Sequence, residues 1–194
     1  MHQLYYDGAR QKLWAVATSI DALLAIDPQT HAVERFCLRT DQWVPLDEPA
    51  MDTLHANSIL ISGETMYVMA RKFGQTSSVY SYNPDMERVS EWEIGKESHS
   101  LCEFNGELYL LDSRGGRILG SDMTRIQICD QKFYARGMAI TPEGVAVVAV
   151  FTFGGRETRQ NGDALIYVYD IKSGKKLQEI TLPDVGNIQD IQFM

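Results

Sequence analysis

Residues 99–112 read His-Ser-Leu-Cys-Glu-Phe-Asn-Gly-Glu-Leu-Tyr-Leu-Leu-Asp. Two short apolar runs flank the Asn105-Gly106 pair, which is typical of a tight, glycine-containing turn. The stretch therefore predicts a β-hairpin, with a first strand that begins at His99 and a second strand over Glu107–Asp112.

The same hairpin pattern occurs three more times, beginning at His2, His55 and Arg136. We call His2, His55, His99 and Arg136 the anchor residues. A third strand and a more polar fourth strand follow each hairpin. Four-stranded units repeated roughly every 40 to 50 residues are typical of propeller blades.

We therefore predict an all-β fold, a β-propeller or propeller segment with about four four-stranded antiparallel blades. The expected domain is single and spans residues 1–194, with blades at 2–42, 55–95, 99–131 and 136–183 and an extra C-terminal strand at 187–194. The longest expected loop, Thr152–Gly162, is a candidate binding loop.

Composition narrows the class of protein. The chain has 194 residues and a formal charge of -8, which disfavours binding to nucleic acid or to an anionic membrane surface. Its three cysteines lack any metal-like spacing, and reduced thiols are expected in a cytoplasmic protein. The first residues do not resemble a secretory signal, so we expect a cytoplasmic location.

The anchor residues are the candidate site. Three of the four histidines occupy one repeat position, at the start of a strand that would line a propeller's central channel. Three interpretations stay open: structural capping of strand ends, a polar pocket, or a divalent metal held by His2, His55 and His99. The pocket would bind a small polar or anionic molecule through the residues His55, Asn57, His99, Arg136, Arg71 and Asp112.

Two neighbours of His55 refine this hypothesis. Asp52, three residues earlier, could orient the imidazole, and Asn57 would share a strand face with His55. Trp14, Tyr67 and Tyr109 share one second-strand position and are expected to fill the space between blades.

The order of these segments resembles an uncharacterised bacterial family of propeller-like proteins, a domain of unknown function sometimes joined to tetratricopeptide repeats. The residues that carry the resemblance are the His-x-Asn-Ser and His-Ser blade starts, Arg136-Gly-Met-Ala, and the terminal Gly186-Asn-Ile-Gln-Asp-Ile-Gln-Phe. More distantly, the pattern is similar to the gluconolactonase and streptogramin-lyase propellers, some of which bind a divalent metal in the channel.

The function expected from these observations is recognition of a ligand or partner at one mouth of the channel. One alternative is a metal-assisted lyase or hydrolase. Another is an interaction module that completes a ring with a protein partner, as in a homodimer formed through the C-terminal strand.

Overall fold

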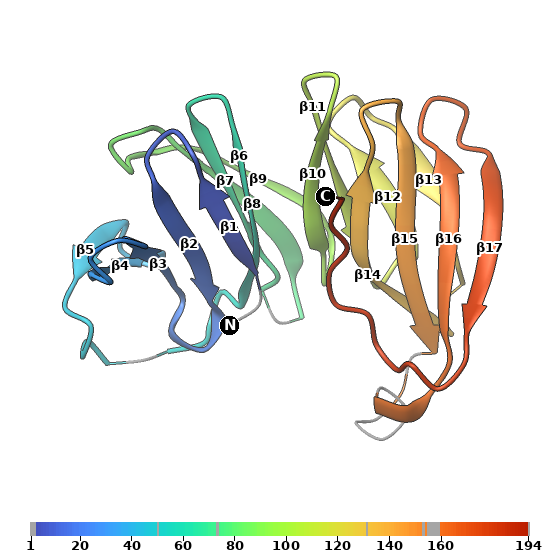
Figure 1. The fold of residues 1–194 in the computed structure, drawn as a ribbon, viewed down its shortest axis with the longest axis horizontal. Coiled ribbons are helices and arrows are strands. Elements are labelled where there is room, and N and C mark those ends of the chain that lie inside the picture. The colour runs from blue at the N-terminus through green and yellow to red at the C-terminus, as the bar shows by residue number, and fades with distance from the viewer. Residues whose placement is uncertain are drawn as a thin grey trace. The chain divides into compact units, whose positions relative to one another are not determined.

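The computed structural model describes residues 3–49, 51–72, 74–130, 132–152, 154 and 160–193. The chain divides into two compact units, Met1–Ile94 and Gly95–Met194, and each holds two antiparallel sheets (Figure 1). Each unit buries its own apolar cluster between its two sheets. The expectation that all four sheets form one propeller domain stays a prediction.

The first sheet of the first unit has five strands in sequence order. They are β1 (Leu4–Asp7), β2 (Lys12–Ala17), β3 (Ala22–Ile26), β4 (Val33–Cys37) and β5 (Gln42–Val44). A 3-10 helix, Thr18–Ile20, joins β2 to β3.

The second sheet of this unit has four strands, again in sequence order. They are β6 (Ala56–Ser62), β7 (Thr65–Ala70), β8 (Thr76–Tyr82) and β9 (Arg88–Lys96). The last residues of β9, from Gly95 on, belong to the second unit.

The second unit repeats this arrangement with two four-stranded sheets. The third sheet contains β10 (His99–Phe104), β11 (Glu107–Asp112), β12 (Arg117–Gly120) and β13 (Arg125–Gln127). The fourth sheet contains β14 (Phe133–Ile140), β15 (Val145–Thr152), β16 (Ala164–Asp170) and β17 (Lys176–Leu182).

Facing sheets pack through large apolar and aromatic side chains, as alternation along each strand requires. In the first unit the buried side chains include Trp14, Phe36, Ile59 and Tyr80. In the second unit they include Tyr109, Leu111, Ile118, Met138, Val148 and Tyr169. The expected placement of Trp14 and Tyr109 in the core between blades is confirmed, whereas Tyr67 is only half-buried and lies outside the apolar cluster of the first unit.

Facing sheets are also joined by polar contacts. In the first unit the Tyr5 hydroxyl donates to the Ile61 carbonyl over 3.1 Å, and the Thr18 hydroxyl donates to the Ala56 carbonyl over 2.7 Å. In the second unit the Ser100 hydroxyl donates to the Arg136 carbonyl over 2.7 Å. The register of one blade against the next is therefore fixed by hydrogen bonds as well as by packing.

The four predicted four-stranded antiparallel blades are confirmed, and one strand is added to the first. This strand, β5, was not predicted because three residues before Pro45 are too short to show alternation. It is held by its pairing with β4 and by the ring of Trp43, which meets Phe36 edge to face with centroids 5.4 Å apart.

The strand predicted at 187–194 is wrong for its described part, because residues 187–193 lie outside the strands. Figure 1 shows this segment running beside β14. A Cβ added to Gly137 would lie 3.2 Å from Ile191 and 3.3 Å from the backbone of Asp190. The segment therefore packs closely against β14 at Gly137, and none of residues 187–193 forms a strand.

Two predictions concern residues that the structure does not describe. The anchor His2 and the arginines of the candidate loop Thr152–Gly162, Arg156 and Arg159, lie outside the described residues. All three cysteines are described and are free thiols, as expected. Burial raises the pKa of the Cys102 thiol to about 12, with a smaller contribution from Asp190.

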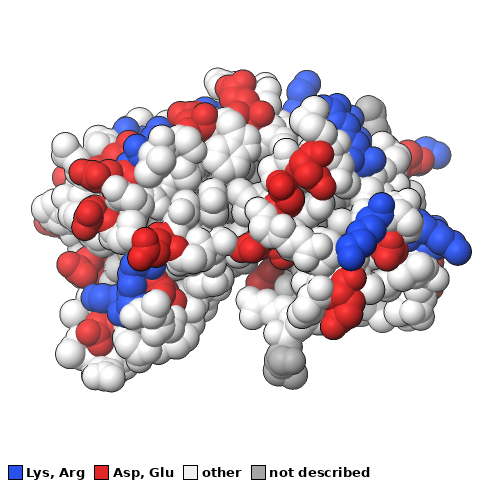
Figure 2. Space-filling view, turned by 90° about the horizontal axis from the view of Figure 1, so that it is seen from above, with Lys and Arg blue, Asp and Glu red and all other residues white. Residues whose placement is uncertain are grey.

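Both signs of charge occur across the face seen in Figure 2, where acidic side chains interrupt the basic ones. Among the described residues, no helix is long and apolar enough to cross a membrane.

The first prediction concerns Asp7, a buried carboxylate at the end of β1. Its Oδ1 accepts the backbone N–H groups of Ala9 and Arg10, each over 3.1 Å, and the Arg10 guanidinium donates to its Oδ2 over 2.7 Å. Burial alone would raise the pKa of Asp7, but these bonds and the Arg10 charge together hold it below its usual value. The stabilisation is therefore present above the unfolded pKa of about 4 and is lost as the pH falls through the lower folded pKa.

We expect Asp7→Asn to lower the free energy of unfolding at pH 7 by about 1 kcal/mol, because the ion pair with Arg10 is removed. Urea unfolding of both proteins at pH 7 and at about pH 2.5 measures this. The difference between them should shrink at the lower pH, because the unfolded carboxyl is protonated there and the native carboxylate loses its advantage as the pH falls. An equal difference at both pH values would contradict the assignment.

Candidate functional site

The innermost strands carry a β-bulge beside each described anchor residue. The strand register shifts between Ala56 and Ser58, between His99 and Cys102, and between Ala135 and Met138. A bulge re-aims the side chains next to it and is common beside functional sites. Because a bulge depends on cross-strand pairing, the sequence pattern did not reveal it.

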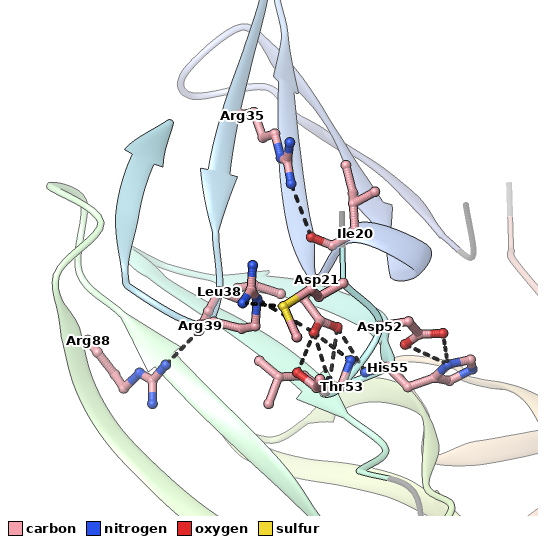
Figure 3. Close-up of polar contacts among 11 residues, drawn as sticks. Ile20, Asp21, Arg35, Leu38, Arg39, Asp52, Thr53, His55 and Arg88 are labelled. Carbon is pink, nitrogen blue, oxygen red and sulfur yellow. Dashed lines mark hydrogen bonds and ion pairs between the residues drawn. The ribbon is translucent and has the colours of Figure 1, made fainter. Parts of the chain in front are cut away.

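His55 precedes the first of these bulges and pairs with Asp52. The imidazole Nδ1 lies 3.1 and 3.0 Å from the two carboxylate oxygens of Asp52 (Figure 3). The side chains are 16% and 33% exposed, so the pair is reachable from solvent. The contact confirms the hypothesis that Asp52 orients the imidazole. A carboxylate acceptor at Nδ1 favours the proton on that nitrogen, which leaves the lone pair on Nε2.

A second carboxylate, Asp21, holds the backbone that carries His55. Asp21 is fully buried, and its oxygens accept both the backbone N–H and the hydroxyl of Thr53, each over 2.7 Å. The same carboxylate accepts the N–H groups of Leu54 and His55, each over 3.1 Å (Figure 3). Three consecutive N–H groups thus converge on one buried anion, and such charge-assisted bonds are stronger than neutral ones.

Positive φ angles show how specific this arrangement is. Asp21 has φ 47° and His55 has φ 51°, in the left-handed region that few non-glycine residues adopt. The contacts of the Asp21 carboxylate offset the cost of the left-handed backbone at Asp21 and His55. Arg39 adds a longer ion pair, with its Nε 4.0 Å from Asp21.

Arg35 supports the same region from β4. Its guanidinium is 2% exposed and donates to the carbonyls of Glu48, Leu46 and Ile20 over 2.6, 3.3 and 3.4 Å. Ile20 immediately precedes Asp21, so Arg35 fixes the chain that enters the carboxylate cluster (Figure 3). Neither Asp21 nor Arg35 was predicted as a site residue. The available signal was a charged residue inside an otherwise apolar stretch.

The other predicted residues of the first unit lie around His55 in different ways. The backbone N–H of Arg71 donates to the His55 carbonyl over 3.3 Å, which brings the exit of β7 to the site. Asn57 is 4% exposed and lies at the bulge, where strand alternation no longer holds. The inference that Asn57 shares a face with His55 rested on that alternation, so it loses its basis.

Of the predicted residues of the second unit, His99 and Asp112 are buried, whereas Arg136 is half-buried. His99 is 4% exposed, its Nδ1 lies 2.9 Å from the Ser113 hydroxyl, and its ring meets Tyr134 edge to face. The carbonyl of Arg136 accepts the Ser100 hydroxyl. These contacts place His99 within the packing of the second unit, and they involve Arg136 through its backbone.

Asp112 is 1% exposed and binds the chain's own groups. Its carboxylate accepts the N–H groups of Lys96 and Gly115, over 2.9 and 3.0 Å, and pairs with the guanidinium of Arg117. Asp112 therefore resembles Asp21: each buried carboxylate holds backbone that leads into an innermost strand.

The metal hypothesis gains no support from the described geometry. Within the described part of the chain, no group of three or more His, Cys, Asp or Glu side chains is placed to hold a metal ion. His55 and His99 belong to different compact units, and His2 is not described.

Comparisons with known proteins agree on the fold. No protein-family model matches the sequence, and no curated protein matches it. Among solved structures, the Dos1 propeller aligns with 97% of this chain and 53% of its own, with a TM-score of 0.52 and 10% identity. The chain is thus similar to a β-propeller, and at this identity the likeness shows the fold alone.

Two further solved structures are similar over most of this chain. A luciferin-regenerating enzyme aligns with 97% of it and 78% of its own chain, with a TM-score of 0.53 and 15% identity. A putative phosphatase from Bacteroides thetaiotaomicron aligns with 91% of it and 44% of its own chain, with a TM-score of 0.59 and 15% identity. This chain therefore spans about half the length of two of the three propeller-like structures.

The second prediction tests the Asp21 carboxylate. Asn tolerates the left-handed backbone, but its amide N–H₂ would face the N–H donors of Thr53, Leu54 and His55. We expect Asp21→Asn to lower the free energy of unfolding by about 3 kcal/mol, since buried charge-assisted bonds are lost. Chemical denaturation measures this change, and Asp47→Asn, at an exposed loop residue, is the control. A change below about 0.5 kcal/mol, as at an ordinary surface position, would show that the carboxylate is not needed.

Proposed function

We propose that this chain is a ligand-binding propeller whose site centres on the Asp52–His55 pair and accepts a small polar or anionic molecule. The observation that carries the proposal is the imidazole held at Nδ1 by Asp52, on a backbone fixed by buried Asp21. The pair is reachable from solvent, with side chains 16% and 33% exposed, so a ligand can approach the oriented ring.

The chemistry of the pair sets the ligand class. Neutral His55 accepts a hydrogen bond at Nε2 from a hydroxyl or amine, and protonated His55 donates one to a carboxylate or phosphate oxygen. Arg71, whose backbone contacts His55, adds a cation at the exit of β7.

Catalysis is the alternative function, and the same pair favours it. A general base needs an imidazole oriented by a third group, which is how Asp52 is placed. Two of the similar solved structures are described as enzymes, a luciferin-regenerating enzyme and a putative phosphatase. A metal-assisted lyase or hydrolase with His2, His55 and His99 as ligands is the less supported form of this alternative.

We further propose that the chain is related to the uncharacterised bacterial propeller family. We also propose a cytoplasmic location, which the three free thiols support. Completion of a ring with a second chain is a third function. Light scattering tests it, since a monomer at all concentrations would contradict it.

The third prediction uses two matched histidines. His31 and His55 both have positive φ, at 61° and 51°, and His31 lies in an exposed turn. Asn tolerates this backbone, so His55→Asn and His31→Asn should both fold. Inorganic phosphate and citrate serve as probes. Their binding is measured by the melting temperature of the protein and by NMR of the histidine rings.

A probe that binds the folded protein should raise the melting temperature of the wild type and of His31→Asn alike. The His55→Asn variant should bind at least tenfold more weakly, which corresponds to about 1.4 kcal/mol. Equal affinity in the two variants, or no binding of either probe by the wild type, would contradict the proposed site.

A further inference from the structure

A pocket of about 270 Å³ lies in the second unit, at the opposite end of β10 from His99. Residues of three hairpins line it: the β10–β11, β12–β13 and β16–β17 connections of the two facing sheets. Its principal lining residues are Phe104, Glu107, Tyr109, Asp122, Thr124 and Lys172. The site is separate from the Asp52–His55 pair, which belongs to the first unit.

The floor of the pocket is aromatic. Phe104 and Tyr109 are 7% and 4% exposed, and their ring centroids lie 6.4 Å apart. Gly144 lies against the Phe104 ring with φ +88°, and a Cβ there would come 2.7 Å from the ring's Cζ. The absence of a side chain at Gly144 therefore makes room for the Phe104 ring. The electron-rich π face of that ring can attract a cation.

Two carboxylates stand at the sides of this floor. Asp122 accepts the Tyr109 hydroxyl over 3.0 Å and the Thr124 N–H over 2.9 Å. Burial alone would raise the pKa of Asp122, but the hydrogen bonds from Thr124 and Tyr109 outweigh it and hold the pKa below its usual value. Glu107 accepts the Ser121 hydroxyl over 2.6 Å.

Neither carboxylate is neutralised by a neighbouring cation. Among the described residues, no Lys or Arg forms an ion pair with Asp122 or Glu107. The pocket therefore combines two anionic groups with an aromatic floor, and both features favour a cation over an anion or a neutral molecule.

Lys172 shows what such a pocket attracts. Its Nζ lies 5.5 Å from the centroid of the Phe104 ring, on an exposed side chain that reaches in from the β16–β17 connection. The chain's own primary ammonium group therefore already stands over the aromatic floor. A long, exposed lysine side chain is easily displaced.

We propose that this pocket binds a small alkylammonium compound, whose ammonium group displaces that of Lys172 and lies between Phe104 and the carboxylates of Asp122 and Glu107. A primary ammonium satisfies both features, because its N–H groups donate to carboxylate oxygens while its charge faces the ring. Lys172 acts as a tethered competitor.

The test uses n-butylammonium chloride as the probe at constant ionic strength. Binding is measured by NMR titration. The neutral n-butanol and the anionic butyrate have the same chain length and are the controls. Asp122→Asn keeps the turn acceptor for Thr124 but removes the charge, Glu107→Gln does the same for Ser121, and Lys172→Met removes the competitor while keeping a long side chain.

We expect n-butylammonium to shift the signals of Phe104 and Tyr109, whereas the two controls at equal concentration do not. Asp122→Asn and Glu107→Gln should each weaken binding at least threefold, and Lys172→Met should strengthen it at least threefold. Thermal unfolding confirms that each variant folds, and Glu107→Gln carries the charge test if Asp122→Asn does not fold.

Three results would overturn the proposal: no shift with n-butylammonium in the wild type and in Lys172→Met, equal binding of n-butanol, or weaker binding by Lys172→Met. The last would show that Lys172 does not compete with the ammonium group for the Phe104 ring. None of these results bears on His55, because the two sites share no residue.

Discussion

A buried carboxylate that binds the backbone entering an innermost strand is the contact on which the candidate site depends. Asp21 gathers the N–H groups of Thr53, Leu54 and His55, and Asp112 does the same for Lys96 in the second unit. Thr53, Leu54 and His55 directly precede β6, and leaving their N–H groups unpaired there would be costly. The carboxylate satisfies these groups and sets where the strand begins.

This arrangement connects the stability of the fold to the chemistry of the site. A histidine at the start of an innermost strand is useful for binding only if its backbone is held, and the left-handed φ of His55 is held by Asp21. Asp52 then fixes the ring. The two carboxylates therefore have different roles. Buried Asp21 positions the backbone, and half-exposed Asp52 orients the imidazole.

Much of the fold follows from local patterns in the sequence. Glycine-containing turns between short apolar runs predicted the β10–β11 and β14–β15 hairpins. The site was harder to predict, because bulges beside His55 and His99 depend on pairing between strands distant in sequence. The segment 187–193 looked like a strand by composition, yet it packs against β14 at Gly137 without strand structure.

Hydrogen exchange of the backbone amides of Thr53, Leu54 and His55 tests the central claim most directly. These residues lie outside any strand, so only the Asp21 carboxylate can protect their amide hydrogens. The account predicts that all three exchange as slowly as the paired amides of β6 and β7. Exchange as fast as that of an exposed loop would contradict it.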